Sequence, residues 1–251
     1  MSRIWLTGGS SGIGAALAEI LLEEGHQLAL SARQIVPLQA LAARFPSQVL
    51  LVAGDISEWQ QVAEIGRHIE HTWGALDLVI LNAGTCEYLE PGHFDTELVE
   101  RVVRTNLLGA SHCVQAALPL LRRGKRPHLV VIGSAVTWLA LPRAGAYGAS
   151  KAALRYLIES LRIDLAAEGI DVTLVSPGFV DTPLTRRNDF PMPMCWSAQR
   201  AARRIATRLR NRPLEINFPQ PFILAIRLFG SLPVRWRLAL GRRLARPQQT
   251  D

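Results

Sequence analysis

The sequence contains few cysteines, and their positions fit neither a metal site nor a disulfide framework. Cys86, Cys113 and Cys195 are the three cysteines among 251 residues. Scattered cysteines indicate free thiols in a reducing compartment, so we expect a cytoplasmic protein. The six histidines are also scattered. We therefore expect no metal site.

Long apolar runs are missing as well. No stretch of about 18 uninterrupted apolar residues occurs, which argues against a membrane-spanning helix. A predicted strand begins already at residue 3, so we expect no signal peptide. The composition is 49% hydrophobic and 20% charged, which is typical of a globular protein with a sizeable core. We expect residues 1–251 to form a single dinucleotide-binding and catalytic domain.

Acidic residues are scarce in one part of the chain. Residues 200–251 contain twelve arginines but only Glu215 and Asp251 as acids. The formal net charge of +7 comes from this segment, because the first 199 residues sum to −3. A basic tail on a mildly acidic body argues against a nucleic-acid partner.

Short apolar runs alternate with amphipathic stretches along most of the chain. This rhythm is typical of a parallel sheet with helices on both faces. We predict an α/β doubly wound (Rossmann) fold with three α/β/α layers and a seven-stranded sheet. The strands are predicted at 3–7, 27–31, 48–53, 76–81, 128–133, 170–176 and 214–218. The helices are predicted at 12–24, 36–44, 58–72, 95–122 (broken or bent), 146–167 and 197–211.

A glycine-rich turn, TGGSSGIG, covers residues 7–14. Its glycines permit a tight turn and a close approach of the backbone to a pyrophosphate. The helix that follows offers unpaired N–H groups to the phosphates. A strand before the turn and a helix after it are the required context, whereas the alternative is a tight turn without a ligand. The candidate cofactor contacts are Gly8, Ser10, Ser11, Gly12, Ile13 and Gly14.

The end of the second predicted strand indicates which cofactor is bound. An acid here would hold a free ribose 2′-hydroxyl, but the chain reads SARQ at 31–34. Arg33 can instead pair with a 2′-phosphate. We therefore favour NADP(H) over NAD(H). The alternative is a solvated Arg33 beside a cofactor that other groups hold.

Tyr147 and Lys151 lie four residues apart in a predicted helix and so share one face. A cation about 5 Å from a phenol, at an effective dielectric constant near 20, stabilises the phenolate by roughly 3 kcal/mol. We therefore expect Lys151 to lower the pKa of Tyr147 by about two units. The pair alone is a common accident of helical spacing, so its meaning depends on other motifs.

The glycine pattern and this pair together resemble the classical short-chain dehydrogenase/reductase family. Further matches follow in the family's order across residues 7–183. They are the segment GDI at 54–56, NAG at 82–84, Asn106, Ser134 thirteen residues before Tyr147, and PGFVDT at 177–182. Each of these alone is usually a turn or a structural amide. Their joint order excludes coincidence.

The resemblance implies hydride transfer between a nicotinamide and a carbonyl or secondary alcohol. It assigns Tyr147 as the acid/base and Lys151 as the group that lowers the phenol pKa and holds the nicotinamide ribose. It assigns Ser134 to the substrate oxygen and Asn106 to a water that connects Lys151 with solvent. The remaining implied cofactor contacts are Asp55, Ile56, Asn82, Ala83, Gly84, Pro177, Gly178, Val180 and Thr182, beside Tyr147 and Lys151. It also implies a homo-oligomer, a dimer or tetramer formed through the helices at 95–122 and 146–167.

An alternative from another class is a non-catalytic NADP(H)-sensing regulator on the same fold. Such a protein is expected to have lost at least one of the four candidate catalytic residues. All four, Asn106, Ser134, Tyr147 and Lys151, are present. The enzyme is therefore the favoured interpretation.

Two segments interrupt the rhythm. Residues 182–200 are rich in proline and contain Met192, Met194 and Trp196, which predicts a flap over a hydrophobic substrate. The alternative is a loop that buries its own apolar side chains. Residues 219–251 predict two basic, amphipathic helices. Either they pack on the body or on another subunit, or they lie on an anionic membrane surface.

Overall fold

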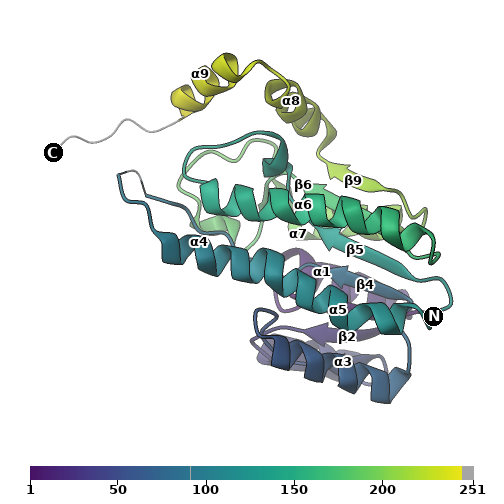
Figure 1. Ribbon diagram of the computed structural model, residues 1–251. Coiled ribbons are helices and arrows are strands. Elements are labelled where there is room, and N and C mark those ends of the chain that lie inside the picture. Colours follow the sequence, from purple (N-terminus) through teal and green to yellow (C-terminus); the bar gives the residue numbers. More distant parts are fainter. Residues whose placement is uncertain (91, 245–251) are drawn as a thin grey trace.

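The structure, a computed structural model, describes residues 1–90 and 92–244. A seven-stranded parallel sheet has the order β3-β2-β1-β4-β5-β6-β9, and helices cover both of its faces (Figure 1). The predicted doubly wound α/β fold is therefore confirmed. The strands are β1 (Arg3–Thr7), β2 (Gln27–Ser31), β3 (Val49–Leu51), β4 (Leu78–Leu81), β5 (His128–Ile132), β6 (Asp171–Pro177) and β9 (Glu215–Phe218).

Alternate residues of each strand contribute to two separate cores. Trp5 of β1 faces the layer of α3 (Trp59–Trp73), α5 (Gly109–Leu121) and α6 (Gly145–Ala166). Ile4 and Leu6 face the layer of α1 (Gly12–Glu23), α2 (Val36–Arg44) and α7 (Ala198–Leu209). Because both faces are buried, the strands read as continuous apolar runs rather than as alternating ones.

The predicted long helix at 95–122 is interrupted. α4 (Thr96–Val103) passes into a π-helical segment, η1 (Arg104–Leu108), before α5 begins. Asn106 lies in that segment and is buried. The expected bend is thus a local change of helix type, which is often found at functional sites.

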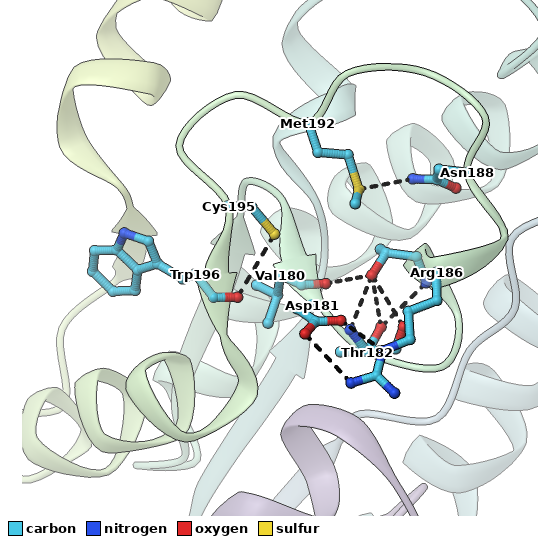
Figure 2. A network of polar contacts seen from close by, with 9 residues as sticks. Val180, Asp181, Thr182, Arg186, Asn188, Met192, Cys195 and Trp196 are labelled. Atoms are coloured by element: carbon cyan, nitrogen blue, oxygen red, sulfur yellow. Dashed lines mark hydrogen bonds and ion pairs between the residues drawn. The ribbon is translucent and has the colours of Figure 1, made fainter.

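Residues 182–196 contain little regular structure beyond a 3₁₀ turn, η3 (Thr185–Arg187). A short parallel pair, β7 (Val180–Asp181) with β8 (Trp196–Ser197), joins the two ends of the segment. Figure 2 shows the polar contacts inside it, including Arg186 with Asp181 and Asn188 with the sulfur of Met192. The segment is therefore tied together at its base and along its length.

The outer part of the segment is fixed to the loop that follows β4. Arg143 donates hydrogen bonds to both Asp189 and Glu90. Tyr88 donates a 3.0 Å hydrogen bond to Oδ1 of Asn188. The ring of Phe190 contacts Tyr88 edge-on, with 5.5 Å between ring centroids. These contacts hold the segment over the carboxyl edge of the sheet.

The predicted basic tail forms α8 (Gln220–Gly230) and α9 (Val234–Leu244), while residues 245–251 lie outside the described part. The inner face of α8 packs on η2 (Ala135–Trp138). The guanidinium groups of Arg155 and Arg227 lie 5.2 and 4.4 Å from the ring centre of Trp138, and both pair with Glu215. Packing on the body, one of the two expectations for the tail, is therefore confirmed for α8.

Among residues 1–90 and 92–244, no helix is both long enough and apolar enough to cross a membrane.

Candidate active site

A cavity of about 500 Å³ opens at the carboxyl ends of the strands. It lies where the strand order reverses beside β1, which is the usual ligand position in open α/β sheets. Two candidate residues, Gly14 and Asn106, do not line it. The candidates that do are Gly8, Ser10, Ser11, Gly12, Ile13, Arg33, Asp55, Ile56, Asn82, Ala83, Gly84, Ser134, Tyr147, Lys151, Pro177, Gly178, Val180 and Thr182.

The glycine turn shapes one wall of this cavity. Gly8 and Gly12 have φ angles of +70° and +56°, which side chains with a Cβ rarely adopt. At Gly14 a Cβ would lie 2.1 Å from the carbonyl oxygen of Gly8, so its role is to let α1 pack against the turn. Within the described chain, the side chain of Ser11 makes no capping hydrogen bond. The first N–H groups of α1 therefore remain available to an anion.

Asn82 connects the glycine turn with the end of β4. Its side-chain amide donates 3.1 Å hydrogen bonds to the carbonyl oxygens of Thr7 and Gly8. In return, the hydroxyl of Thr7 accepts the backbone N–H groups of Asn82 and Ala83, both at 3.1 Å. Asn82 therefore fixes the two sides of the cavity relative to each other.

Arg33 and Asp55 lie together at the end of the cavity that β2 and β3 form. Arg33 Nη1 is 3.9 Å from Asp55 Oδ2, and the Arg33 side chain is 78% exposed. Asp55 is oriented by Ser57, whose N–H and hydroxyl both donate to Oδ1 at 2.9 and 2.8 Å. A long ion pair at the surface is weak, so the guanidinium is free to turn toward another anion.

Lys151 is buried in the middle of the site. Its ammonium donates a 2.9 Å hydrogen bond to the carbonyl oxygen of Ile132, at the end of β5. A Cβ on Gly84 would lie 3.4 Å from the same ammonium, so the glycine gives the lysine its space. Burial lowers the pKa of Lys151 to about 8.

Asn106 lies behind Lys151 and holds the surrounding backbone. Its Oδ1 accepts the N–H of Thr85 at 2.8 Å, and its Nδ2 donates to the carbonyl oxygen of Thr85 and to the hydroxyl of Ser150, both at 2.9 Å. These bonds connect the π segment with α6 and with the loop after β4. One lone pair of Oδ1 is left for a further donor.

Tyr147 is half-buried and lines the cavity together with Ser134. Burial raises the pKa of Tyr147 to about 12, the thiol of Cys86 adds to the rise, and Ser134 opposes it. The expected lowering by Lys151 is not found, because burial dominates and the ammonium bonds to Ile132 instead. Helical spacing alone placed the two residues on one face but did not fix where the ammonium points.

Several residues around the site belong to no motif of the sequence. Tyr88 and the pair Glu87–Arg101, whose closest atoms are 3.2 Å apart, come from the irregular loop after β4 and from α4. On the opposite side, a Cβ on Gly178 would lie 2.8 Å from the ring of Phe222, so α8 reaches the site. One feature of the sequence could have indicated the residues of the loop after β4: this loop follows the carboxyl end of a central strand.

Comparisons with known proteins identify the family of the chain. The chain matches the short chain dehydrogenase family over residues 2–190. An uncharacterized oxidoreductase of Myxococcus xanthus (strain DK1622) is 34% identical over 242 residues, which cover 95% of this chain and 96% of the relative. A short chain dehydrogenase from Burkholderia cenocepacia J2315, solved in complex with NADP, has a TM-score of 0.81 and 26% identity over 98% of both chains.

Another solved structure, the RhlG/NADP active-site complex of Pseudomonas aeruginosa, has a TM-score of 0.80 and 27% identity. The match covers 88% of this chain and 96% of that one. The fold, the order of the motifs along the chain and the family match all lead to one conclusion. The chain belongs to the short-chain dehydrogenase family and is an oxidoreductase of that family.

Proposed function

We propose that this protein is an NADP(H)-dependent oxidoreductase that transfers a hydride between the nicotinamide and a carbonyl or secondary alcohol of a hydrophobic substrate. One observation carries the proposal. Tyr147, Ser134 and the buried Lys151 line the same cavity as the glycine turn. A proton donor and an anion-binding turn thus share one space.

The cavity fits a dinucleotide phosphate. The close approach of Gly14 to Gly8 and the available N–H groups of α1 suit a pyrophosphate. Arg33 suits a 2′-phosphate because no carboxylate follows directly after β2. The NADP in the Burkholderia cenocepacia and Pseudomonas aeruginosa structures supports this choice. The bound cofactor supplies or accepts the hydride.

The side chains supply the proton and the orientation. With a pKa raised to about 12, Tyr147 is protonated at neutral pH and suits the acid of a reduction. Ser134 donates a hydrogen bond to the substrate oxygen as negative charge develops there. Lys151 stays cationic below about pH 8 and holds the nicotinamide ribose, while Asn106 fixes the backbone behind it.

Apolar side chains of the flap and of the elements that contact it favour an apolar substrate. Phe179, Phe190 and Phe222 contact one another in a chain of rings, with centroid separations of 6.1 and 5.4 Å. Met192 and Leu184 of the flap, residues 182–200, are half-buried. We therefore propose that this flap selects hydrophobic ketones, aldehydes or quinones.

A homo-oligomer is part of the proposal. Tyr156 and Ile163 on α6 are 78% and 77% exposed, although both side chains are large and apolar. A second copy that packs on α6 would bury them. Sedimentation at increasing protein concentration measures this association.

Replacing Tyr147 by phenylalanine tests the function. We expect Tyr147→Phe to reduce turnover of hydrophobic carbonyls by about 10²–10⁴-fold, because general acid catalysis is lost. NADPH affinity, measured by fluorescence, should stay nearly unchanged. Tyr156→Phe, on the same helix but at the surface, is the matched control. Near-normal turnover by Tyr147→Phe would contradict the role of the phenol.

The same assay separates the enzyme from a sensor. If the wild-type protein binds NADPH tightly but consumes it with no member of a panel of ketones, aldehydes and quinones, the non-catalytic regulator becomes the better interpretation. Carbonyl-dependent loss of NADPH absorbance supports the enzyme.

A further inference from the structure

The outer faces of α8 and α9 expose an unusual set of large apolar side chains. On α8, Leu224 and Leu228 are each 64% exposed and lie one turn apart. On α9, Trp236 is 67% exposed, and Val234 and Leu238 are also exposed. Both helices lie at one margin of the molecule, outside the three layers (Figure 1). We call these exposed apolar side chains of the two successive helices the tail face.

The α8 part of the tail face is held outward because the opposite side of that helix is docked on the body. Ile223 and Ile226 of α8 are buried against η2, and Leu240 of α9 packs on that cluster. A Cβ on Gly230 would lie 2.1 Å from the carbonyl oxygen of Trp138, so α8 lies directly on the body. The exposed leucines therefore cannot turn inward without undocking α8.

Charge on the tail face has one sign. Residues 216–250 contain no aspartate and no glutamate. Arg235, Arg242 and Arg243 are exposed, and none of them has a carboxylate partner in the described part of the chain. Elsewhere on the surface arginines are commonly paired, as Arg122 is with Glu168. The tail face therefore combines apolar area with unneutralised cations.

We propose that the tail face binds the surface of an anionic lipid bilayer. Leucine, valine and tryptophan side chains would enter the boundary between headgroups and acyl chains, and the arginines would contact lipid phosphates. Tryptophan is favoured at this depth because its ring is apolar and its N–H is polar. A second copy of the chain fits this surface less well, because symmetry would bring two sets of unpaired arginines together.

The proposal joins the two interpretations of the tail that the sequence left open. The inner face of α8 packs on the body, and the outer faces of α8 and α9 are left for the membrane. It is independent of the proposed activity, because none of its residues lines the cavity.

Flotation of the full-length protein with vesicles tests the proposal. We expect binding to vesicles of phosphatidylcholine with phosphatidylglycerol at low salt, and much weaker binding to phosphatidylcholine alone. Arg235→Gln/Arg242→Gln should lower the partition coefficient for anionic vesicles by about 30-fold, from roughly fivefold for each cation. Trp236→Ala/Leu238→Ala should lower it by about tenfold through lost apolar burial.

Two exposed arginines of α7 provide a matched control with the same loss of charge. Arg203→Gln/Arg208→Gln should change the partition coefficient by less than about threefold if the position of the arginines, rather than the net charge of the protein, determines binding to anionic vesicles. Equal losses in the two arginine pairs would refute a specific face. So would equal binding of the wild-type protein to neutral and anionic vesicles, or no binding at all.

Sedimentation without lipid tests whether a second copy of the chain, rather than a membrane, occupies the tail face. If Trp236→Ala/Leu238→Ala dissociates an oligomer and leaves flotation unchanged, the tail face is a contact between copies and the membrane proposal fails. An unchanged oligomeric state together with lost flotation supports it. Thermal unfolding of each variant confirms that the exposed substitutions leave the fold intact.

Discussion

The ammonium of Lys151 is expected to lose its proton near pH 8, well below the usual lysine value of 10.5. Burial is the main cause, because a single 2.9 Å hydrogen bond to the carbonyl oxygen of Ile132 takes the place of a full hydration shell. A shift of this size corresponds to about 3 kcal/mol in favour of the neutral amine. Lys151 is thus charged at pH 7 at a cost to stability.

The sign of the pH effect follows from linkage. In the unfolded chain the lysine keeps its proton up to about pH 10.5, whereas in the folded chain it releases the proton near pH 8. Between these values the unfolded state binds more protons, so the contribution of Lys151 to stability rises with pH. Below pH 8 both states are protonated and the full penalty remains.

Lys151→Met removes the charge but keeps much of the side-chain volume. We expect it to stabilise the protein at pH 7 by about 1–2 kcal/mol, because a relief of about 3 kcal/mol is offset by the unpaired carbonyl of Ile132. Turnover should be lost at the same time. Urea unfolding at pH 7 and pH 10 measures the difference, which should shrink at the higher pH.

The titration itself can be observed directly. The chain has only two lysines, Lys125 and Lys151, so ¹³C-labelled lysine gives two Cε signals, and Lys125→Arg assigns them. A Lys151 signal that titrates above about pH 10 would refute the reasoning, since burial would then have little effect on the ammonium. A Lys151→Met variant less stable than wild type at pH 7 would do the same.

Three further predictions follow from the cofactor site and the fold. Arg33→Asp should raise the KM for NADPH by about 10–100-fold, because a charged hydrogen bond is lost, and should shift the preference toward NADH. An unchanged ratio of the kcat/KM values for NADPH and NADH would mean that another group contacts the 2′-phosphate. Gly14→Ala places a methyl group 2.1 Å from the Gly8 oxygen and should lower the free energy of unfolding by about 1–3 kcal/mol. Gly241→Ala, which meets open space, should raise it by about 0.5–1 kcal/mol, and equal effects would contradict the close-packing argument. Burial lowers the pKa of His128 from 6.5 to about 4, so the unfolded state binds more protons in that window and the free energy of unfolding should fall by about 3 kcal/mol as pH drops through it. His128→Gln should flatten this part of the pH curve, and a curve parallel to the wild type would refute the assignment.

Most of the architecture was predictable because it depends on local pattern. Strands such as 3–7 and 27–31 agree with the structure to the residue, since each is a short apolar run between turn residues. The break in the predicted helix at 95–122 was expected as well, and it lies at 104–108. The pairing of β8 with β7 was not predicted, because a strand of two residues, Trp196–Ser197, is too short to show a periodic pattern.

The sequence by itself determined the family, the order of the motifs and the residues that meet at the carboxyl edge of the sheet. These follow from local spacing, because a strand that runs into a turn and then a helix puts the turn residues at the carboxyl end of that strand. No distant segment is needed to predict this position. Tertiary structure decided what those residues do electrostatically. Lys151 points to Ile132, and burial raises the pKa of Tyr147, because desolvation depends on every segment that packs around a group. It also decided the division of the tail into an inner and an outer face. Trp138, Arg155 and Arg227 are far apart in the sequence, and only folding brings them together to dock α8 on the body.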